Sequence, residues 1–350
     1  MTNEGFFKAA ARPYVDPSAD AQHALAVMTV SSKEVLFGVG SARRKDHTSV
    51  QDASKAAMLQ AIASAGKQPQ DTPRLVLVTL PRSFEEEAIE GIVEVVGPNT
   101  ALVGGTAGGP KFEVFGENEV YDNGISLLAI YTDLPMGWIF EGGFDVKDQP
   151  SGVVTKVDGN AIVEIENRPA LEVYDGWLDG HISRLATEVK DPKSIRTLLT
   201  LHPLYRKYTS PEGQDHFLFS HPWPKDDSVE TKIIMTSTKI KVGERIYVSS
   251  GSWQTFLNRI GNLPIKAKVA GGIGATQGSI FGIGYICAGV MGVIPESERA
   301  KMSFLINHNN NNAPFIAPFT WGEQGQFPGI GNKHGNLLTG FVVVGGSKSR

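Results

Sequence analysis

The stretch Leu75-Val-Leu-Val-Thr-Leu80 decides the fold of this chain. It is almost entirely apolar, which is typical of a central strand covered on both faces. A helix is predicted after it, from Ser83 to about Val96, because Ser83 and Glu86 have the spacing of a capping box. A short buried strand at residues 101–103 follows. The order strand, helix, strand predicts an α/β sheet.

The flanking regions extend this pattern. The sequence predicts a strand at residues 35–39 and a helix at residues 50–63 before the central stretch, and paired strands at residues 112–115 and 125–131 after it. Turn-forming residues gather at 149–152, where we expect the first domain to end.

The second half again mixes strands and helices. Its predicted elements are a hairpin at 153–165, helices at 170–178 and 253–270, and strands at 217–219, 231–236, 245–248, 279–288, 314–321 and 337–344. We therefore predict an α/β protein with two sheet-plus-helix domains, in which helices pack on the outer faces of mixed sheets. The predicted divisions are an N-terminal extension (1–33), two domains (34–150 and 151–346) and a polar tail (347–350).

Composition limits the possible functions. A formal net charge of −4 over 350 residues argues against nucleic-acid binding, which needs a concentrated basic face. The single cysteine excludes an intrachain disulfide bond. The first residues do not have the pattern of a secretory signal, and no apolar run reaches the length of about 18 residues that a membrane-spanning helix needs. We expect a cytoplasmic protein without membrane insertion.

A glycine-rich stretch at residues 104–109 is the first candidate site. We predict a loop here, and the amides of Gly104, Gly105 and Thr106 could hold an anion. It lacks the lysine and the spacing of a P-loop. Close packing between strands is the alternative explanation for these glycines.

A second candidate site combines Cys287 with a polar stretch near the C-terminus. Cys287 is either a small inert core residue or a thiol in a ligand pocket. Glu323, His334 and Asn336 are predicted in or beside one loop, where they either bind a ligand or organise the loop. We expect the two candidate sites to meet at the domain interface, since small-molecule pockets favour such interfaces.

Catalysis is not expected. No serine lies in a Gly-x-Ser-x-Gly nucleophile elbow. A Cys287–His334 pair is the one candidate for acyl chemistry, and nothing in the sequence brings these two residues together. The remaining classes of function are a ligand-binding sensor and a protein-interaction scaffold.

Several motifs together resemble the FIST domain family. They run from about residue 34 to residue 346 and comprise Gly38-Val-Gly-Ser41, Leu102-Val-Gly-Gly-Thr-Ala-Gly108, Asn123-Gly-Ile-Ser126, Asn167-Arg-Pro-Ala170, His202-Pro-Leu204, Ile286-Cys-Ala288, Trp321-Gly-Glu323 and His334-Gly-Asn336.

The resemblance implies a sensory or signal-transduction module. Such proteins are proposed to bind small ligands such as amino acids, and some are fused to signalling or F-box segments. A subset resembles haem-binding nitric-oxide sensors, for which His334 would be the haem ligand. The resemblance therefore implies no cofactor, or haem as the alternative, and a signalling protein as the partner that receives the output.

Overall fold

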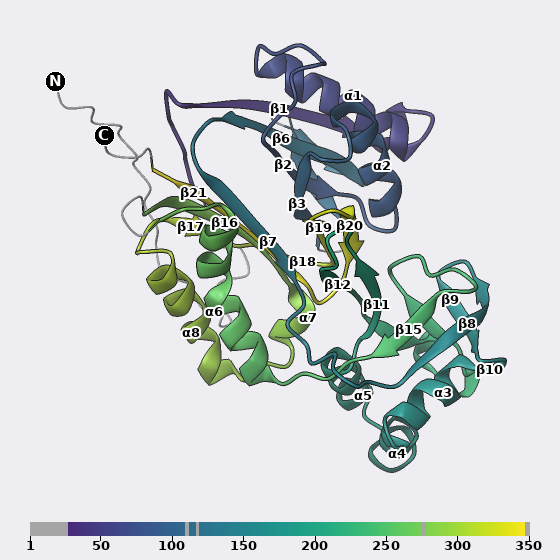
Figure 1. Ribbon diagram of the computed structural model, residues 1–350. Helices are drawn as coiled ribbons and strands as arrows, with labels where there is room; N and C mark the ends of the chain where they lie inside the picture. The colour runs from purple at the N-terminus through teal and green to yellow at the C-terminus, as the bar shows by residue number, and fades with distance from the viewer. Residues whose placement is uncertain (1–26, 109–111, 117–118, 275–277, 347–350) are drawn as a thin grey trace.

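The structure is a computed structural model that describes residues 27–108, 112–116, 119–274 and 278–346. The predicted tail (347–350), most of the predicted extension (1–26) and Gly109 lie outside the described residues. The described part is a mixed α/β protein in which helices pack against several sheets, which confirms the predicted fold class (Figure 1).

The first sheet has six strands in the order β1-β6-β2-β3-β19-β20. Its strands are β1 (Val35–Arg43), β6 (Gly124–Thr132), β2 (Leu75–Leu80), β3 (Ala101–Thr106), β19 (Glu323–Phe327) and β20 (Gly331–Gly335). Helices α1 (Val50–Ser64) and α2 (Glu85–Val96) pack on one face of it. β2 and β3 run parallel, whereas β6 and β19 are antiparallel to their neighbours.

The second sheet has five strands and lies against the free face of the first. They are β17 (Phe315–Ile316), β16 (Ser279–Cys287), β21 (Thr339–Gly345) and β7 (Met136–Glu141), with β18 (Phe319–Thr320) also paired to β16. Helices α6 (Trp253–Ala270), α7 (Ala288–Met291) and α8 (Glu296–Asn309) contribute to the core on its outer side. The order of layers is therefore helix, sheet, sheet, helix (Figure 1).

The position of β2 in the middle of the first sheet explains why its sequence is almost entirely apolar. Successive side chains of a strand point to opposite faces. Val76, Val78 and Leu80 join the core beneath α1 and α2. Leu75 and Leu77 join the core between the two sheets. The prediction of a central strand with both faces buried is confirmed.

A third sheet belongs to a subdomain inserted between β7 and α6, at the lower right of Figure 1. Its order is β12-β11-β15-β8-β9-β14-β13, and β10 pairs with β9. Its elements are β8 (Ser151–Asp158), β9 (Ala161–Ile165), β10 (Arg168–Pro169), α3 (Ala170–Trp177), α4 (His181–Arg184), α5 (Pro192–Leu201), β11 (Leu204–Thr209), β12 (Asp215–Ser220), β13 (Pro222–Pro224), β14 (Ile234–Thr236) and β15 (Arg245–Val248). A further pair, β4 (Glu113–Gly116) with β5 (Glu119–Asp122), lies beside β1 and β6.

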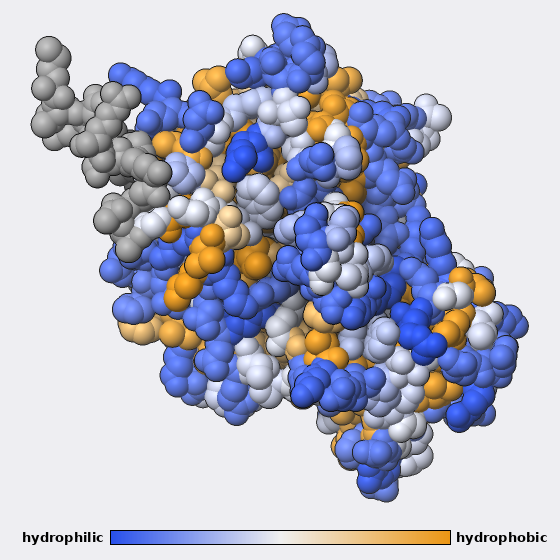
Figure 2. Space-filling view, in the orientation of Figure 1, coloured by the Kyte–Doolittle hydropathy of each residue, from blue (hydrophilic) through white to orange (hydrophobic). Residues whose placement is uncertain are grey.

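Strands from the two halves of the chain are shared between the two packed sheets. β19 and β20 extend the first sheet, although they lie more than 200 residues after β3. Conversely, β7 from the first half of the chain pairs with β21 in the second sheet. The face of the molecule in Figure 2 is largely hydrophilic with scattered apolar patches, which is ordinary for a globular surface.

Four local predictions were wrong. The strands predicted at residues 112–115 and 125–131 do not pair with each other, because β4 pairs with β5 and β6 pairs with β1 and β2. Ser83 does not cap α2: it adopts a positive φ of 70°, and Phe84 occupies the cap position without a side-chain hydrogen bond. Gly104, Gly105 and Thr106 do not form a loop, because β3 extends through Thr106. The polar stretch after residue 322 is not a loop either, because it forms the β19–β20 hairpin. Its buried side chains include the polar residues Glu323, Gln324 and His334, so the hairpin has no apolar alternation that would predict strands.

Candidate functional site

The two predicted site segments lie side by side. β3 pairs antiparallel with β19, so that Gly105 is opposite Glu323 and Gly104 is opposite Gln324. The amide of Thr106 also donates to the carbonyl of Gly322 at 2.8 Å. The pairing occupies the backbone that was predicted to hold an anion, so Gly104 and Gly105 serve close packing here. A Cβ at Gly105 would lie 2.2 Å from Thr320 Cγ2.

Four buried side chains form a network between β3, α2 and the β19–β20 hairpin. We call Glu85, Thr106, Gln324 and His334 the His334 network. The hydroxyl of Thr106 donates to Glu85 Oε1 at 2.9 Å and accepts from Gln324 Nε2 at 3.1 Å. Gln324 Nε2 also lies 3.0 Å from His334 Nδ1, so this ring nitrogen is the acceptor. The network joins residues more than 200 positions apart.

Two polar atoms of the His334 network lack partners. Gln324 Oε1 and His334 Nε2 are enclosed and make no hydrogen bond within the described residues. His334 Nε2 lies 3.8 Å from Glu85 Oε1, beyond hydrogen-bond distance. Buried polar atoms without partners are rare and costly, and they often mark a functional site.

A second network occupies the opposite face of β19. We call Cys287, Thr320, Glu323 and Arg259 the Glu323 network. The carboxyl group of Glu323 accepts from the Thr320 hydroxyl at 2.7 Å and from the Leu338 amide at 3.2 Å. It also hydrogen-bonds the thiol of Cys287. Arg259 is buried nearby and donates to the Leu337 carbonyl at 3.3 Å.

Burial controls the protonation of the Glu323 network. Loss of solvent raises the pKa of Glu323 to about 8, which the Thr320 hydrogen bond only partly opposes. Burial, together with the nearby carboxylate, raises the pKa of the Cys287 thiol. Burial lowers the pKa of Arg259 to about 10. Cys287 is therefore a protonated thiol, not the thiolate that nucleophilic catalysis or metal ligation requires.

The structure does not bring Cys287 and His334 together. Glu323 and Gln324 are consecutive in β19 and point to opposite faces of the sheet. Cys287 contacts the first of these and His334 the second. The two side chains therefore lie on different sides of the strand, and the candidate Cys–His pair is not formed.

Asn336 connects the hairpin to the inserted subdomain. Its backbone amide donates to the Phe219 carbonyl at 2.9 Å, and its side-chain oxygen accepts from the Ser237 hydroxyl. Its Nδ2 donates to the Trp321 carbonyl at 3.4 Å. This predicted site residue therefore holds elements in place.

The surroundings of His334 do not fit a haem group. A haem ligand needs an open path from its coordinating nitrogen to the iron and a flat apolar slot for the macrocycle. His334 is 2% exposed, one ring nitrogen is held by Gln324, and the other faces Glu85 at 3.8 Å. No space for a macrocycle exists between these side chains.

A charged cluster that no sequence motif predicted lies where β11, β20 and α2 meet. We call Arg206, Tyr208, Lys333 and Glu86 the Arg206 cluster. Arg206 is 8% exposed; its Nη1 donates to the Lys239 carbonyl at 2.8 Å, whereas Nε and Nη2 have no partner within the described residues. Lys333 Nζ lies 5.4 Å from the centre of the Tyr208 ring.

Electrostatic interactions join the Arg206 cluster to the His334 network. Burial lowers the pKa of Lys333, and the neighbouring Arg206 lowers it further. Burial raises the pKa of Glu86, an effect that His334 and Arg206 oppose. No motif pointed to these residues, because they converge from three elements distant in sequence.

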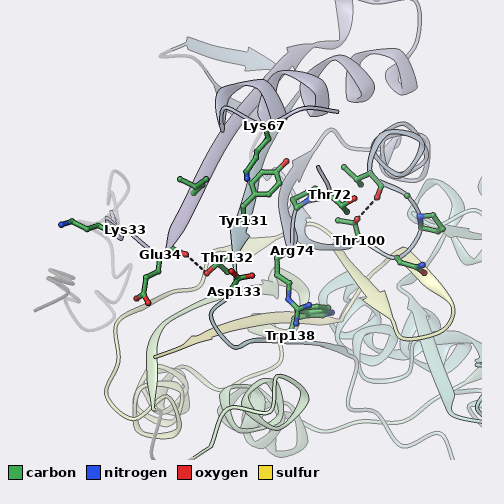
Figure 3. A pocket seen from close by; sticks show the side chains of 16 residues that line it. Lys33, Glu34, Lys67, Thr72, Arg74, Thr100, Tyr131, Thr132, Asp133 and Trp138 are labelled. Carbon is green, nitrogen blue, oxygen red and sulfur yellow. Dashed lines mark hydrogen bonds between the residues drawn. The ribbon is translucent and has the colours of Figure 1, made fainter. Parts of the chain in front are cut away.

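Cavities occur elsewhere in the described part of the chain. One of about 920 Å³ is an open groove at the ends of the first-sheet strands. In Figure 3 Lys67 lies against the Tyr131 ring and Arg74 against Trp138. Another, of about 520 Å³, lies between the two packed sheets. Neither is lined by a residue of the His334 network.

Comparison with known families found a match for the first part of the chain. Residues 11–168 match the model of the FIST N domain, so this part of the chain is similar to the FIST family. The match confirms the resemblance for the N-terminal part and does not extend to the C-terminal part. FIST domains are sensory and signal-transduction domains, which supports a general sensory role.

Two further findings accompany this match. No curated protein matches the chain. Among the described residues, no helix is long and apolar enough to cross a membrane.

Proposed function

We propose that this protein binds a small ligand carrying both a carboxylate and an ammonium group, such as an amino acid, at the Arg206 cluster. A signalling partner recognises the ligand-bound form of the protein, and no chemical reaction takes place. The observation that carries this proposal is the pair of unpartnered donors on buried Arg206.

The chemistry of Arg206 favours a carboxylate ligand. The guanidinium group presents its donors in a fixed fork that matches the two oxygens of a carboxylate. Arg206 Nη1 donates to the carboxylate of Glu244 at 3.4 Å and forms an ion pair with it, whereas the Nε and Nη2 donors are left for another acceptor. Lys333 adds a second positive charge nearby.

The other end of the ligand requires an acceptor for an ammonium group. Glu86 is partly buried and interacts electrostatically with Arg206 and His334. A ligand ammonium group beside Glu86 would favour its ionised form, because an opposite charge stabilises the carboxylate. The unpartnered atoms His334 Nε2 and Gln324 Oε1 add a donor and an acceptor, and His334 interacts electrostatically with Glu86.

Binding is coupled to movement of the inserted subdomain. Arg206 is on β11 of this subdomain, whereas Glu86 and Lys333 belong to the first sheet and its helix. The free donors are enclosed in this conformation, so a ligand reaches them only when the two parts separate. A ligand that binds one arrangement better shifts the population toward it, and a partner can recognise that arrangement.

A thermal-shift measurement with each of the twenty amino acids tests the proposal. We expect at least one to raise the melting temperature, because a ligand that binds only the folded state stabilises it. Arg206→Lys retains the positive charge but loses the forked arrangement of donors. We expect it to weaken binding of that amino acid by about tenfold or more, which corresponds to about 1.4 kcal/mol. The matched control is Arg168→Lys, at an exposed position on β10.

Two results would overturn the proposal. One is the absence of a shift with any amino acid at millimolar concentration. The other is equal binding by the wild type and Arg206→Lys, with both folded by circular dichroism. Stoichiometric capture of a protein partner that no amino acid alters would instead favour a scaffold, and turnover of a thioester that is lost in Cys287→Ala would favour an enzyme.

A further inference from the structure

The cavity between the two packed sheets is distinct from the charged site. It has a volume of about 520 Å³ and lies on the face of the first sheet opposite α1 and α2. β2 and β6 supply Leu77 and Leu128 on one side, and β16 supplies Phe281 and Ile283 on the other. Volumes of about 300–1,000 Å³ are typical of small-molecule sites.

The lining of this cavity is apolar apart from two hydroxyl groups. Thr79 on β2 and Tyr285 on β16 provide these hydroxyls, and no charged side chain of the described residues contributes to the wall. Burial raises the pKa of Tyr285, and no hydrogen bond to the protein contributes to this shift. The Tyr285 hydroxyl is therefore neutral, and a ligand oxygen can accept its proton in a hydrogen bond.

Within the described residues the cavity is partly open to solvent, so a small molecule can enter it from outside. The space lies between two sheets that are otherwise in direct contact through the core of Val103, Ile130 and Val342.

We infer that this cavity binds an uncharged, mainly apolar small molecule with one hydroxyl or carbonyl group, held by the hydroxyls of Thr79 and Tyr285. An ionised ligand is disfavoured because no cation among the described residues lines the cavity to pair with a carboxylate. The Arg206 cluster is therefore suited to a charged ligand, and this cavity to an uncharged one. The inference does not depend on the proposed amino-acid site.

Calorimetric titration of the full chain with 1-octanol tests this inference, with octanoate at pH 8 as the charged counterpart. We expect octanol to bind saturably and octanoate at least about tenfold more weakly. Leu128→Trp should abolish octanol binding by filling the cavity. Should that variant fail to fold, Leu77→Phe fills the same space with a smaller change.

The hydroxyl contact has its own pair of variants. Tyr285→Phe should weaken octanol binding by about 2–10-fold, the range for one neutral hydrogen bond. Tyr247→Phe removes a hydroxyl from the inserted subdomain and should leave binding unchanged. Arg206→Lys should also leave octanol binding unchanged, which separates failure here from failure of the charged site.

Three outcomes would overturn the inference. They are an absence of saturable octanol binding, equal binding of octanol and octanoate, and octanol binding that survives both folded filling variants. The last of these would mean that octanol binds an apolar surface elsewhere.

Discussion

Glu323 lies in an environment very different from that of the unfolded chain. It is fully buried, and its carboxyl group accepts hydrogen bonds from Thr320 and the Leu338 amide. These donors stabilise the charged form, but they do not replace the solvent that burial removes. Consequently the folded protein holds a proton on Glu323 that the unfolded chain releases at neutral pH.

This proton predicts a pH dependence of stability. The folded pKa is raised, so the stabilising contribution is complete below the unfolded pKa, near 4.3, and is lost as pH rises toward about 8. Glu323→Gln keeps a neutral group of the same shape, and its contribution does not titrate. Relative to this variant, we expect the wild type to lose on the order of 1–4 kcal/mol of unfolding free energy between pH 5 and pH 8.

Urea denaturation of both proteins at pH 5, 6, 7 and 8 measures this difference. Taking the difference cancels contributions from groups that the substitution does not affect. Parallel stability curves for the wild type and Glu323→Gln would show that Glu323 is ionised in the folded state at pH 7.

At the level of elements, close packing of β1 on α1 depends on glycine. A Cβ at Gly40 would lie 1.9 Å from the Ala57 carbonyl oxygen, a backbone atom that cannot move without displacing the helix. We expect Gly40→Ala to destabilise the protein by about 2 kcal/mol or more. Gly176→Ala, on α3, meets nothing within 4 Å and should instead stabilise by about 0.5–1 kcal/mol.

Thermal and urea denaturation of the two variants test both stability predictions. A wild-type stability for Gly40→Ala would mean that α1 can shift away from β1 without loss of packing.

The capping of helices provides a second comparison at this level. α6 begins with a capping box in which Ser252 and Thr255 satisfy each other's backbone amides. We expect Ser252→Ala to cost about 1 kcal/mol of unfolding free energy. Ser83→Ala should change it by less than about 0.5 kcal/mol, since the Ser83 side chain does not cap α2. Equal losses in both variants, measured by urea denaturation, would contradict the assignment of the caps.

At the level of the whole molecule, the two halves complete each other's sheets. The first sheet needs β19 and β20 from the end of the chain, and the second needs β7 from the first half. Removing the C-terminal strands exposes the edge of β3 and the buried partners of Thr106. Unpaired edges and orphaned polar groups are both strongly unfavourable.

We therefore expect a fragment of residues 1–150 not to fold cooperatively by itself. Circular dichroism and urea denaturation of the fragment, alone and mixed with residues 151–350, measure this. We expect a cooperative transition only in the mixture. A fragment that unfolds cooperatively alone would show that β1, β6, β2 and β3 are sufficient, and that the boundary predicted near residue 150 separates independent folding units.

The sequence by itself determined the elements whose signal is local. The apolar run of β2 and the small-residue face of α1 identified a strand and a helix with nearly the observed bounds, because periodicity and burial act over neighbouring residues. It also identified α6 at its observed bounds and the resemblance to the FIST N domain.

Only the tertiary structure decided how the polar residues combine. Thr106, Gln324 and His334 form one network because β19 joins β3 across the length of the chain, a pairing that no local pattern encodes. The same pairing turned the predicted loops at 104–106 and after residue 322 into strands. Arg206 escaped prediction because its environment is made by other elements. Long-range pairing and burial, which determine a side chain's partners and its pKa, exist only in the folded chain.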